Sequence, residues 1–321
     1  MTMTDVAPGR RIDWIDIARG VALVAMAVYH FSWDLEFFGY LDPGTAGSGP
    51  LKWFARCIAS SFLILVGISL VLAHSKGIRW QGFGRRLAMI VAAAAAITAA
   101  TFWFTPDAYV FFGILHHIAF ASVFGLLFLR LPAIVLIAIA AFWLSVPFWG
   151  KSLAFDAPWL SWLGLSPFPP RSNDFVPVFP WFAAVLAGMA LAKAMIATDA
   201  TEWLRAHPPG SNAIGRVLRF LGRHSLVTYL AHQPILIACV YLFSLASPPN
   251  PETGFVRACV DGCAAQYSSE TCESFCNCAL AELKEKGLFE RVYRGEINQS
   301  TNPEVAAVTD ACTIEAIPDG H

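Results

Sequence analysis

Long runs of apolar residues divide most of this chain into segments of one kind. About seven of them reach or approach the roughly 20 residues that a helix needs to cross a bilayer. They cover residues 14–33, 53–73, 87–104, 108–129, 131–149, 178–196 and 221–247. Strands of about ten alternating residues, which membrane barrels require, do not occur in the sequence. The pattern therefore predicts an all-α polytopic membrane protein with about seven transmembrane helices.

Polar segments flank this apolar region at both ends. Residues 1–10 are expected to form a short N-terminal segment, and no small-residue cleavage site follows the first apolar run. That run is therefore expected to remain as a helix rather than to be removed as a signal peptide. Residues 11–247 are expected to form the transmembrane domain, and residues 248–321 a small helical tail that is rich in cysteine.

Composition supports the membrane assignment and excludes one class of partner. Hydrophobic residues make up 56% of the 321 residues and charged residues only 14%, whereas soluble domains average about 25% charged residues. Membrane lipids are thus expected around the helices. The net charge of −1 indicates no particular partner, and the basic residues are scattered in short loops, so no nucleic acid is expected to bind. The oligomeric state stays open, with a homodimer as one option.

Basic residues gather in alternate loops, which predicts an orientation. The positive-inside rule places loops rich in Lys and Arg in the cytoplasm. These loops hold Arg10, Arg11, Lys76, Arg79, Arg85, Arg86, Arg130, Arg205, Arg216, Arg219 and Arg223. The N-terminus is therefore expected in the cytoplasm, and the end of the last span outside it.

The cysteines indicate the same orientation. Cys57 and Cys239 fall in apolar runs, where a lone cysteine is usually a small packing residue. The other six lie in the tail: Cys259, Cys263, Cys272, Cys276, Cys278 and Cys312. Their C-x3-C and C-x-C spacings favour disulfides over the zinc site that is the competing interpretation. Disulfides need an oxidising compartment, so the tail is expected in the periplasm and the helices in the inner membrane of a bacterium.

Ionisable residues interrupt the first apolar run. In "RGVALVAMAVYHFSWD", Arg19 and His30 are eleven residues apart, which is three helical turns plus roughly 20° and about 16 Å along the axis. They therefore share a face, and Asp34, four residues after His30, lies on it too. An acid beside an imidazole can fix its tautomer and raise its basicity, as a general base requires.

A structural interpretation stands beside this one. Arg19 could pair with Asp16, three residues earlier, and Asp34 could lie at the membrane interface. His30 could hydrogen-bond a neighbouring helix without doing chemistry. Ionisable groups inside a membrane are costly, however, so a functional role is the default hypothesis.

Further polar residues lie at comparable depth in later runs. "FFGILHHIAF" contains His116 and His117, and "LGRHSLVTYLAHQPILI" contains His224, Tyr229 and His232. Tyr229 and His232 are three residues apart and share a helix face. Pro234 interrupts the hydrogen-bond ladder there, which is common beside membrane sites. Each residue alone is as consistent with packing as with chemistry, but together they predict a polar cavity.

These motifs carry a resemblance to a known family. "IDIARGVALVAMAVYHF", "GILHHIA", "FPWFAAVLAGMALA" and "HSLVTYLAHQPILI" resemble, in this order, motifs of the heparan-alpha-glucosaminide N-acetyltransferase catalytic-domain family and its bacterial members, within the transmembrane acyltransferases. The resemblance covers about residues 11–247. The Arg19–His30 spacing also resembles that of the acyltransferase-three O-acetyltransferases. In the heparan-type enzymes the catalytic histidine falls near the position of Leu41, where this chain has none.

The resemblance implies transfer of an acetyl group from cytosolic acetyl-CoA to a sugar or glycan across the membrane. His30, oriented by Asp34, is then the expected base, and His116 or His117 the group that stabilises the oxyanion. The cations expected at the CoA phosphates are Arg19, Arg86, Arg223 and His224. The groups expected at the sugar are Asp174, Trp159, Trp162 and His232. No metal is expected.

Two other functional classes remain as alternatives. A haem-binding electron-transfer protein would use membrane histidines as axial ligands, although no span carries two histidines about a dozen residues apart. A transporter with a histidine relay is the third possibility, although no inverted repeat is visible in the sequence. Acyl transfer is therefore the leading hypothesis.

Overall fold

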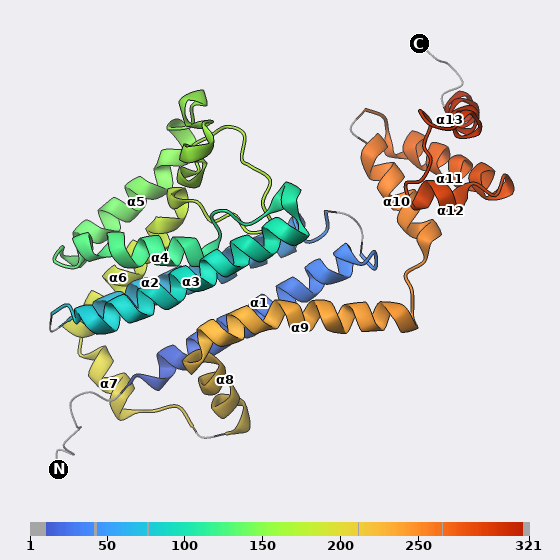
Figure 1. Ribbon diagram of the computed structural model, residues 1–321. Coiled ribbons are helices and arrows are strands. Elements are labelled where there is room, and N and C mark those ends of the chain that lie inside the picture. The colour runs from blue at the N-terminus through green and yellow to red at the C-terminus, as the bar shows by residue number, and fades with distance from the viewer. Residues whose placement is uncertain (1–10, 42–43, 76, 211, 265, 317–321) are drawn as a thin grey trace. The chain divides into compact units, whose positions relative to one another are not determined.

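The computed structural model is built from helices joined by loops (Figure 1). It describes residues 11–41, 44–75, 77–210, 212–264 and 266–316. The predicted N-terminal segment 1–10, with Arg10, and the loop residue Lys76 therefore lie outside the described residues. No strand occurs within the described ranges, which confirms the all-α prediction.

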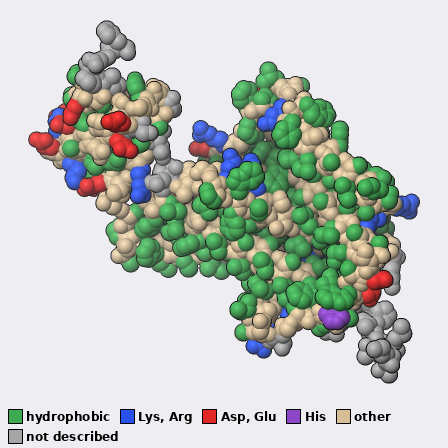
Figure 2. Space-filling model, turned by 180° about the vertical axis from the view of Figure 1, so that it is seen from behind, with side chains coloured by type: hydrophobic (Ala, Val, Ile, Leu, Met, Phe, Trp, Pro, Cys, Tyr) green, Lys and Arg blue, Asp and Glu red, His purple; other side chains and the backbone are tan. Residues whose placement is uncertain are grey.

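Among the described residues, five helices are long and apolar enough to cross a membrane. They are α1 (Asp13–Phe37), α2 (Gly49–His74), α3 (Trp80–Phe104), α6 (Val178–Ala197) and α9 (Ser225–Ala246). Two shorter apolar helices occupy the other predicted spans, so the prediction of a polytopic helical membrane protein holds with a division into five long and two short helices. Hydrophobic side chains accordingly cover most of the face of the helical region seen in Figure 2.

The fourth predicted span is shorter than its apolar run. The chain first forms a short 3₁₀ turn, η1 (Pro106–Ala108), and α4 (Ile114–Phe124) begins only afterwards, continued by η2 (Gly125–Phe128). In between, Thr98 donates a hydrogen bond to the Val110 carbonyl (2.7 Å) and Thr101 accepts one from the Val110 amide (2.9 Å). These hydroxyl groups of α3 satisfy backbone groups that a helix would otherwise pair, so the predicted start at residue 108 is wrong.

The region before the last span also differs from its pattern. After α5 (Ala133–Trp149) and α6 come two short helices, α7 (Ala200–Ala206) and α8 (Ala213–Arg223). The apolar residues from 221 onward thus begin in α8, and α9 starts after His224. The seventh predicted span therefore begins at Ser225 rather than at residue 221.

The chain divides into two compact units. The first takes its described residues from Met1–Met26 and Phe54–His232. In its core, α5 packs along α6, and the fully buried side chains of Phe182, Leu186 and Met189 come from α6. Aromatic rings of α4 and α5 surround Phe182, including those of Phe124 and Trp143.

Glycines allow two pairs of helices in the first unit to approach closely. A Cβ atom on Gly67 of α2 would lie 2.0 Å from the Val185 carbonyl oxygen, and one on Gly188 of α6 would lie 2.1 Å from that of Ile64. In the same way, a Cβ on Gly222 of α8 would lie 1.8 Å from the Asp16 carbonyl oxygen. Small residues at helix crossings are typical of membrane proteins, and the second crossing joins α8 to α1.

The second unit comprises Ala27–Trp53 and Gln233–His321. It contains the end of α1, most of α9 and the tail helices α10 (Pro251–Cys263), α11 (Ser269–Glu285), α12 (Phe289–Tyr293) and α13 (Pro303–Ala316). Tyr40, after α1, donates a hydrogen bond to the carbonyl of Ser247, after α9. The predicted domain boundary at residue 247 falls in the connection between α9 and α10 and stays a prediction.

The disulfide prediction for the tail is confirmed. All six tail cysteines are paired, as Cys259–Cys276, Cys263–Cys272 and Cys278–Cys312. The first two bonds join α10 to α11, and the third joins α11 to α13. The side chains of Leu283, Phe289, Val305 and Val308 form a small apolar core that includes the third bond, Cys278–Cys312.

Candidate active site

Arg19 of α1 is held by two partners. Its Nη1 donates to Asp16 Oδ1 (2.9 Å), one turn earlier on the same helix, and its Nη2 donates to Ser69 Oγ of α2 (2.5 Å). Ser69 in turn donates to the Leu65 carbonyl (2.5 Å). The ion pair with Asp16 that the sequence offered as the structural interpretation is therefore present. The bond to Ser69 is an additional contact, and it fixes the plane of the guanidinium.

The α8–α1 crossing brings two further arginines to α1. Arg223 Nη2 lies 2.9 Å from Asp13 Oδ1, and Arg219 Nη1 lies 3.2 Å from Asp13 Oδ2. Arg223 Nε also lies 3.5 Å from Asp16 Oδ2. The two aspartates of the first turn of α1 thus balance much of the positive charge of Arg19, Arg219 and Arg223.

A cavity of about 710 Å³ opens between these helices. We call it the α1–α9 cavity, because its walls come from α1, α2, α3 and the start of α9, with smaller parts from α4, α7 and α8. All four residues predicted at the CoA phosphates line it: Arg19, Arg86, Arg223 and His224. Its lining also includes the apolar residues Leu65, Leu115 and Ile118 and the side chain of Tyr229.

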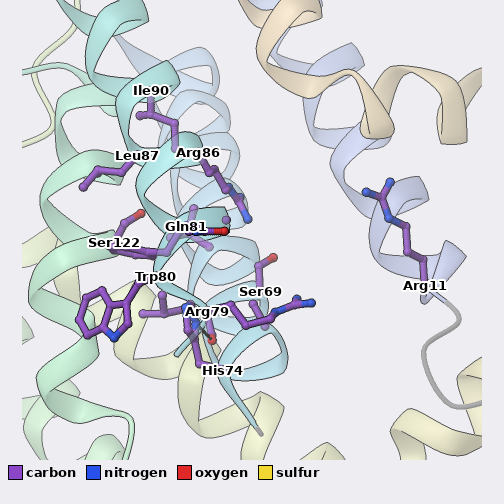
Figure 3. A pocket seen from close by; sticks show the side chains of 15 residues that line it. Arg11, Ser69, His74, Arg79, Trp80, Gln81, Arg86, Leu87, Ile90 and Ser122 are labelled. Atoms are coloured by element: carbon purple, nitrogen blue, oxygen red, sulfur yellow. Dashed lines mark hydrogen bonds between the residues drawn. The ribbon is translucent and has the colours of Figure 1, made fainter. Parts of the chain in front are cut away.

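A second cavity, of about 780 Å³, lies at the end of α2 and the start of α3. We call it the α2–α3 cavity (Figure 3). Its polar lining comprises Arg11, Ser69, His74, Arg79, Gln81, Arg86 and Ser122. Arg11, Ser69 and Arg86 belong to the linings of both cavities, together with Val66, Ala73 and Ile90. The two cavities therefore share a wall.

The predicted base and its partner lie on the second half of α1. Asp34 is fully buried, and its Oδ1 accepts a hydrogen bond from Gln233 Nε2 (2.7 Å). His30 is half-buried, with its ring edge-on to that of Tyr29. Arg19 and His30 belong to one unbroken helix, as the spacing predicted. The role of Asp34 in orienting His30 stays a prediction. Gln233 is a hydrogen-bond partner of Asp34 that the sequence did not predict.

Asp174 lies in the loop before α6 and contacts the start of α4. Its Oδ2 accepts a hydrogen bond from the Ile114 amide (2.8 Å). A Cβ on Gly113 would lie 2.3 Å from the same oxygen, so glycine there lets the carboxyl group reach the helix. Burial raises the pKa of Asp174 to about 6, and the hydrogen bond from Ile114 opposes this rise.

The two tryptophans predicted at the sugar lie in the 3₁₀ helix η4 (Pro158–Leu163), which follows η3 (Leu153–Phe155). Trp162 is half-buried, and its ring centroid lies 5.8 Å from that of Phe112 and 5.7 Å from that of Phe120. Its Nε1 donates to the carbonyl of Trp159 (2.8 Å). Trp159 is 74% exposed. Trp159 therefore offers a free ring face, whereas Trp162 packs into the protein.

The adjacent histidines of α4 point to different surroundings. His116 Nδ1 accepts from the Gly113 amide (3.3 Å), and its Nε2 lies 3.1 Å from Thr98 Oγ1, whose proton goes to the Val110 carbonyl. His117 is fully buried, with Nδ1 3.0 Å from the Val176 carbonyl. A carbonyl only accepts, so Nδ1 of His117 carries the proton. These contacts position α4, and the predicted oxyanion role of either residue stays a prediction.

Residues 11–234 match the model of the family described as Heparan-alpha-glucosaminide N-acetyltransferase, catalytic. The chain belongs to this family. Comparison with curated proteins and with solved structures finds no match. The family assignment, together with the apolar helices, makes the protein a multi-pass membrane protein of an acetyltransferase family. It therefore favours acyl transfer over the haem-protein and transporter alternatives.

The range matched by the N-acetyltransferase family contains the linings of both cavities as well as His30, Asp34 and His232. His232 Nδ1 lies 2.5 Å from the Tyr229 carbonyl, one turn earlier on α9. The tail helices lie outside the matched range. Sequence reasoning missed Ser69 and Arg79 as lining residues, although a serine within the apolar run of α2 was a visible signal.

Proposed function

We propose that the protein transfers an acetyl group from cytosolic acetyl-CoA to a hydroxyl or amine of a sugar on the extracytoplasmic side of a bacterial inner membrane. The observation that carries the proposal is the α1–α9 cavity, where all four residues predicted to contact the donor line one space. Family membership supports the type of chemistry.

The donor is large and polyanionic, so its phosphates have to remain outside the roughly 30 Å hydrocarbon core. Only the thin pantetheine arm can extend between helices. The α1–α9 cavity suits the arm, since Ser69, Arg19 and Tyr229 offer hydrogen bonds and the apolar side chains of its lining, such as Leu65 and Leu115, offer apolar contacts. Arginine is suited to phosphates because its planar fork donates two parallel hydrogen bonds.

In the proposed reaction His30 takes the proton from the hydroxyl or amine of the acceptor. The oxygen or nitrogen attacks the acetyl carbonyl carbon, the carbon–sulfur bond breaks, and the proton passes to the CoA thiolate. A base of this kind typically contributes about 10²–10⁴-fold in rate. Asp34 fixes His30, and the exposed ring of Trp159 stacks on the sugar while Asp174, Trp162 and His232 shape its surroundings.

Transfer across the membrane can be tested directly with the full chain in lipid vesicles. Glucosamine is enclosed inside the vesicles, and acetyl-CoA with an isotope-labelled acetyl group is added outside. We expect labelled sugar inside, measured by mass spectrometry. Replacing glucosamine by N-acetylglucosamine, which has no free amine, separates O- from N-acetylation. Labelled product that forms only when donor and sugar are on the same side would contradict the proposed sidedness. No labelled product under any arrangement would contradict the donor and acceptor together.

The periplasmic location of the tail has its own test. We expect thiol reagents added from outside to leave the six tail cysteines unlabelled until a reductant is present, because all six are paired. After reduction, a reagent that cannot cross membranes should label them in intact spheroplasts. Labelling that appears only once the inner membrane is permeabilised would place the tail in the cytoplasm instead.

A further inference from the structure

The α2–α3 cavity has a charge balance that the α1–α9 cavity lacks. No acidic residue is among its described lining residues, and its arginines are Arg11, Arg79 and Arg86. Within the described part of the chain, none of these three arginines has an ion-pair partner. Figure 3 shows Arg79 and Arg86 extending from the start of α3 toward the same side, across from Arg11.

The other arginines of the α1–α9 cavity are neutralised. Arg19 pairs with Asp16, Arg223 with Asp13 and Arg205 with Glu202 (2.5 Å). Uncompensated positive charge is therefore concentrated in the α2–α3 cavity and in the wall that it shares with its neighbour. Such a site attracts a ligand group with several negative charges.

We propose that the α2–α3 cavity binds the 3′-phosphoadenosine end of CoA, with Arg79 on the 3′-phosphate and with Arg11 and Arg86 on the diphosphate. This inference rests on the proposed function and adds the site that distinguishes CoA from its dephosphorylated form. The CoA phosphates, which the sequence predicted beside Arg223 and His224 among others, are here assigned to Arg11, Arg79 and Arg86. Arg223 pairs with Asp13, whereas these three arginines have no ion-pair partner among the described residues.

The order of the cations along the two cavities supports this arrangement. Arg79 lines only the α2–α3 cavity, Arg86 and Arg11 line both, and Arg19 lines only the α1–α9 cavity. CoA carries its groups in the same order: the 3′-phosphate at the nucleotide end, then the diphosphate, then the uncharged pantetheine arm. The direction is set by apolar residues that line only the α1–α9 cavity, Leu65, Leu115 and Ile118, because they suit the arm and not a phosphate.

Size and hydrogen bonding agree with a nucleotide. A volume of about 780 Å³ is within the roughly 300–1,000 Å³ of small-molecule sites. His74 Nδ1 lies 2.8 Å from the Leu70 carbonyl, which leaves Nε2 for a ligand. Gln81 adds an amide on the same lining, so base and ribose groups have both donors and acceptors available.

The inference predicts how the protein distinguishes CoA from 3′-dephospho-CoA. Binding of each is measured by isothermal titration calorimetry on the purified full chain in detergent, without any acceptor. We expect CoA to bind about 10- to 100-fold more tightly, because a charge-assisted arginine–phosphate contact is lost in the dephospho form. In Arg79→Ala the affinity for CoA should fall to that for dephospho-CoA, whose own affinity should stay unchanged.

Two variants serve as controls. Arg86→Ala should lower the affinity for both CoA and 3′-dephospho-CoA, because both ligands retain the diphosphate. Arg85 is next to Arg86 on α3 but lines neither cavity. Arg85→Ala should therefore leave both affinities unchanged. Equal wild-type affinities, or equal losses of both ligands in Arg79→Ala, would overturn this inference and leave the proposed donor intact. If the wild-type protein bound neither ligand, the proposed function would fail together with it.

Discussion

The helices of the first unit and the four helices of the tail distribute their side chains in opposite ways. In the first unit large apolar side chains are exposed, with Trp103 at 81% and Phe148 at 89%, while the polar residues Asp16, Ser69 and His117 are buried. In the tail the buried side chains are apolar or cystine, and charged groups gather on the surface (Figure 2). The difference indicates two solvents, lipid for the first region and water for the second.

The two regions also use different means of stabilisation. In lipid the hydrophobic effect between helices is absent, so close packing at glycines and polar contacts such as Arg19–Ser69 have to supply stability. The tail, residues 248–321, is no longer than the roughly 70–80 residues below which a hydrophobic core alone rarely suffices, and it has three disulfides. A substitution that removes a tail disulfide should therefore not destabilise the first unit, and one that disturbs a helix crossing of the first unit should not destabilise the tail.

Removal of a disulfide should give the largest effect and should be confined to the tail. The Cys278–Cys312 bond closes the longest segment, 34 residues, for which chain entropy predicts a loss of about 4 kcal/mol, against about 3 kcal/mol for each of the others. We expect Cys278→Ser with Cys312→Ser to speed amide hydrogen exchange in α11 and α13, measured by mass spectrometry. Exchange in α2 and α6 should not change. Cys57→Ser, at an unpaired cysteine of α2, is the matched control. Equally faster hydrogen exchange in the tail and in the first unit would show that the two regions are not stabilised separately.

Asp174 should make the stability of the first unit depend on pH. Its folded-state pKa is raised from 3.8 to about 6, so the folded protein retains a proton that the unfolded chain loses. The stability it contributes is fully present below about pH 4 and is lost as pH rises through about 6, by about 3 kcal/mol at most. Asp174→Asn should flatten this part of the melting-temperature profile, and Asp107→Asn, an exposed neighbour in η1, should not. An unchanged profile in Asp174→Asn would show that the carboxyl is not the titrating group.

Enlarging a crossing glycine should destabilise the first unit and spare the tail. In Gly188→Ala the new Cβ would meet the Ile64 carbonyl oxygen, which we expect to cost about 1–3 kcal/mol as overpacking. Thermal unfolding in detergent would measure this loss, and hydrogen exchange would locate it in α2 and α6. Gly84→Ala, where nothing lies within 4 Å of the new Cβ, should be neutral or stabilising. A neutral Gly188→Ala would mean that the α2–α6 approach is not as close as described.

Arg19→Lys should have the smallest effect, and it concerns binding. Lysine keeps the charge but loses the planar fork that reaches Asp16 and Ser69 together. We expect the KM for acetyl-CoA to rise about tenfold while kcat changes little. Arg85→Lys, at an arginine that lines neither cavity, provides a control. A severe fall in kcat with an unchanged KM would instead place Arg19 at the transition state.

Much of this architecture could be predicted from the sequence, because hydropathy and cysteine spacing are local signals. The long helices and the disulfide-bonded tail follow from them. The shortened α4 could not, since Thr98 and Thr101 of another helix hold its preceding residues. The ion pair of Arg223 with Asp13 and the hydrogen bond of Asp34 with Gln233 each join residues that lie more than 190 positions apart in the sequence. No local pattern can predict such contacts.

We propose that His30 is the base of an acetyl-CoA-dependent transfer. The most direct test compares turnover of labelled acetyl-CoA by His30→Ala and by His207→Ala, an exposed histidine after α7, with CoA binding measured on the same samples. We expect His30→Ala to lose about 10²–10⁴-fold in kcat with unchanged CoA affinity, while His207→Ala stays like the wild type. Wild-type turnover in His30→Ala would remove His30 from the mechanism and contradict the account.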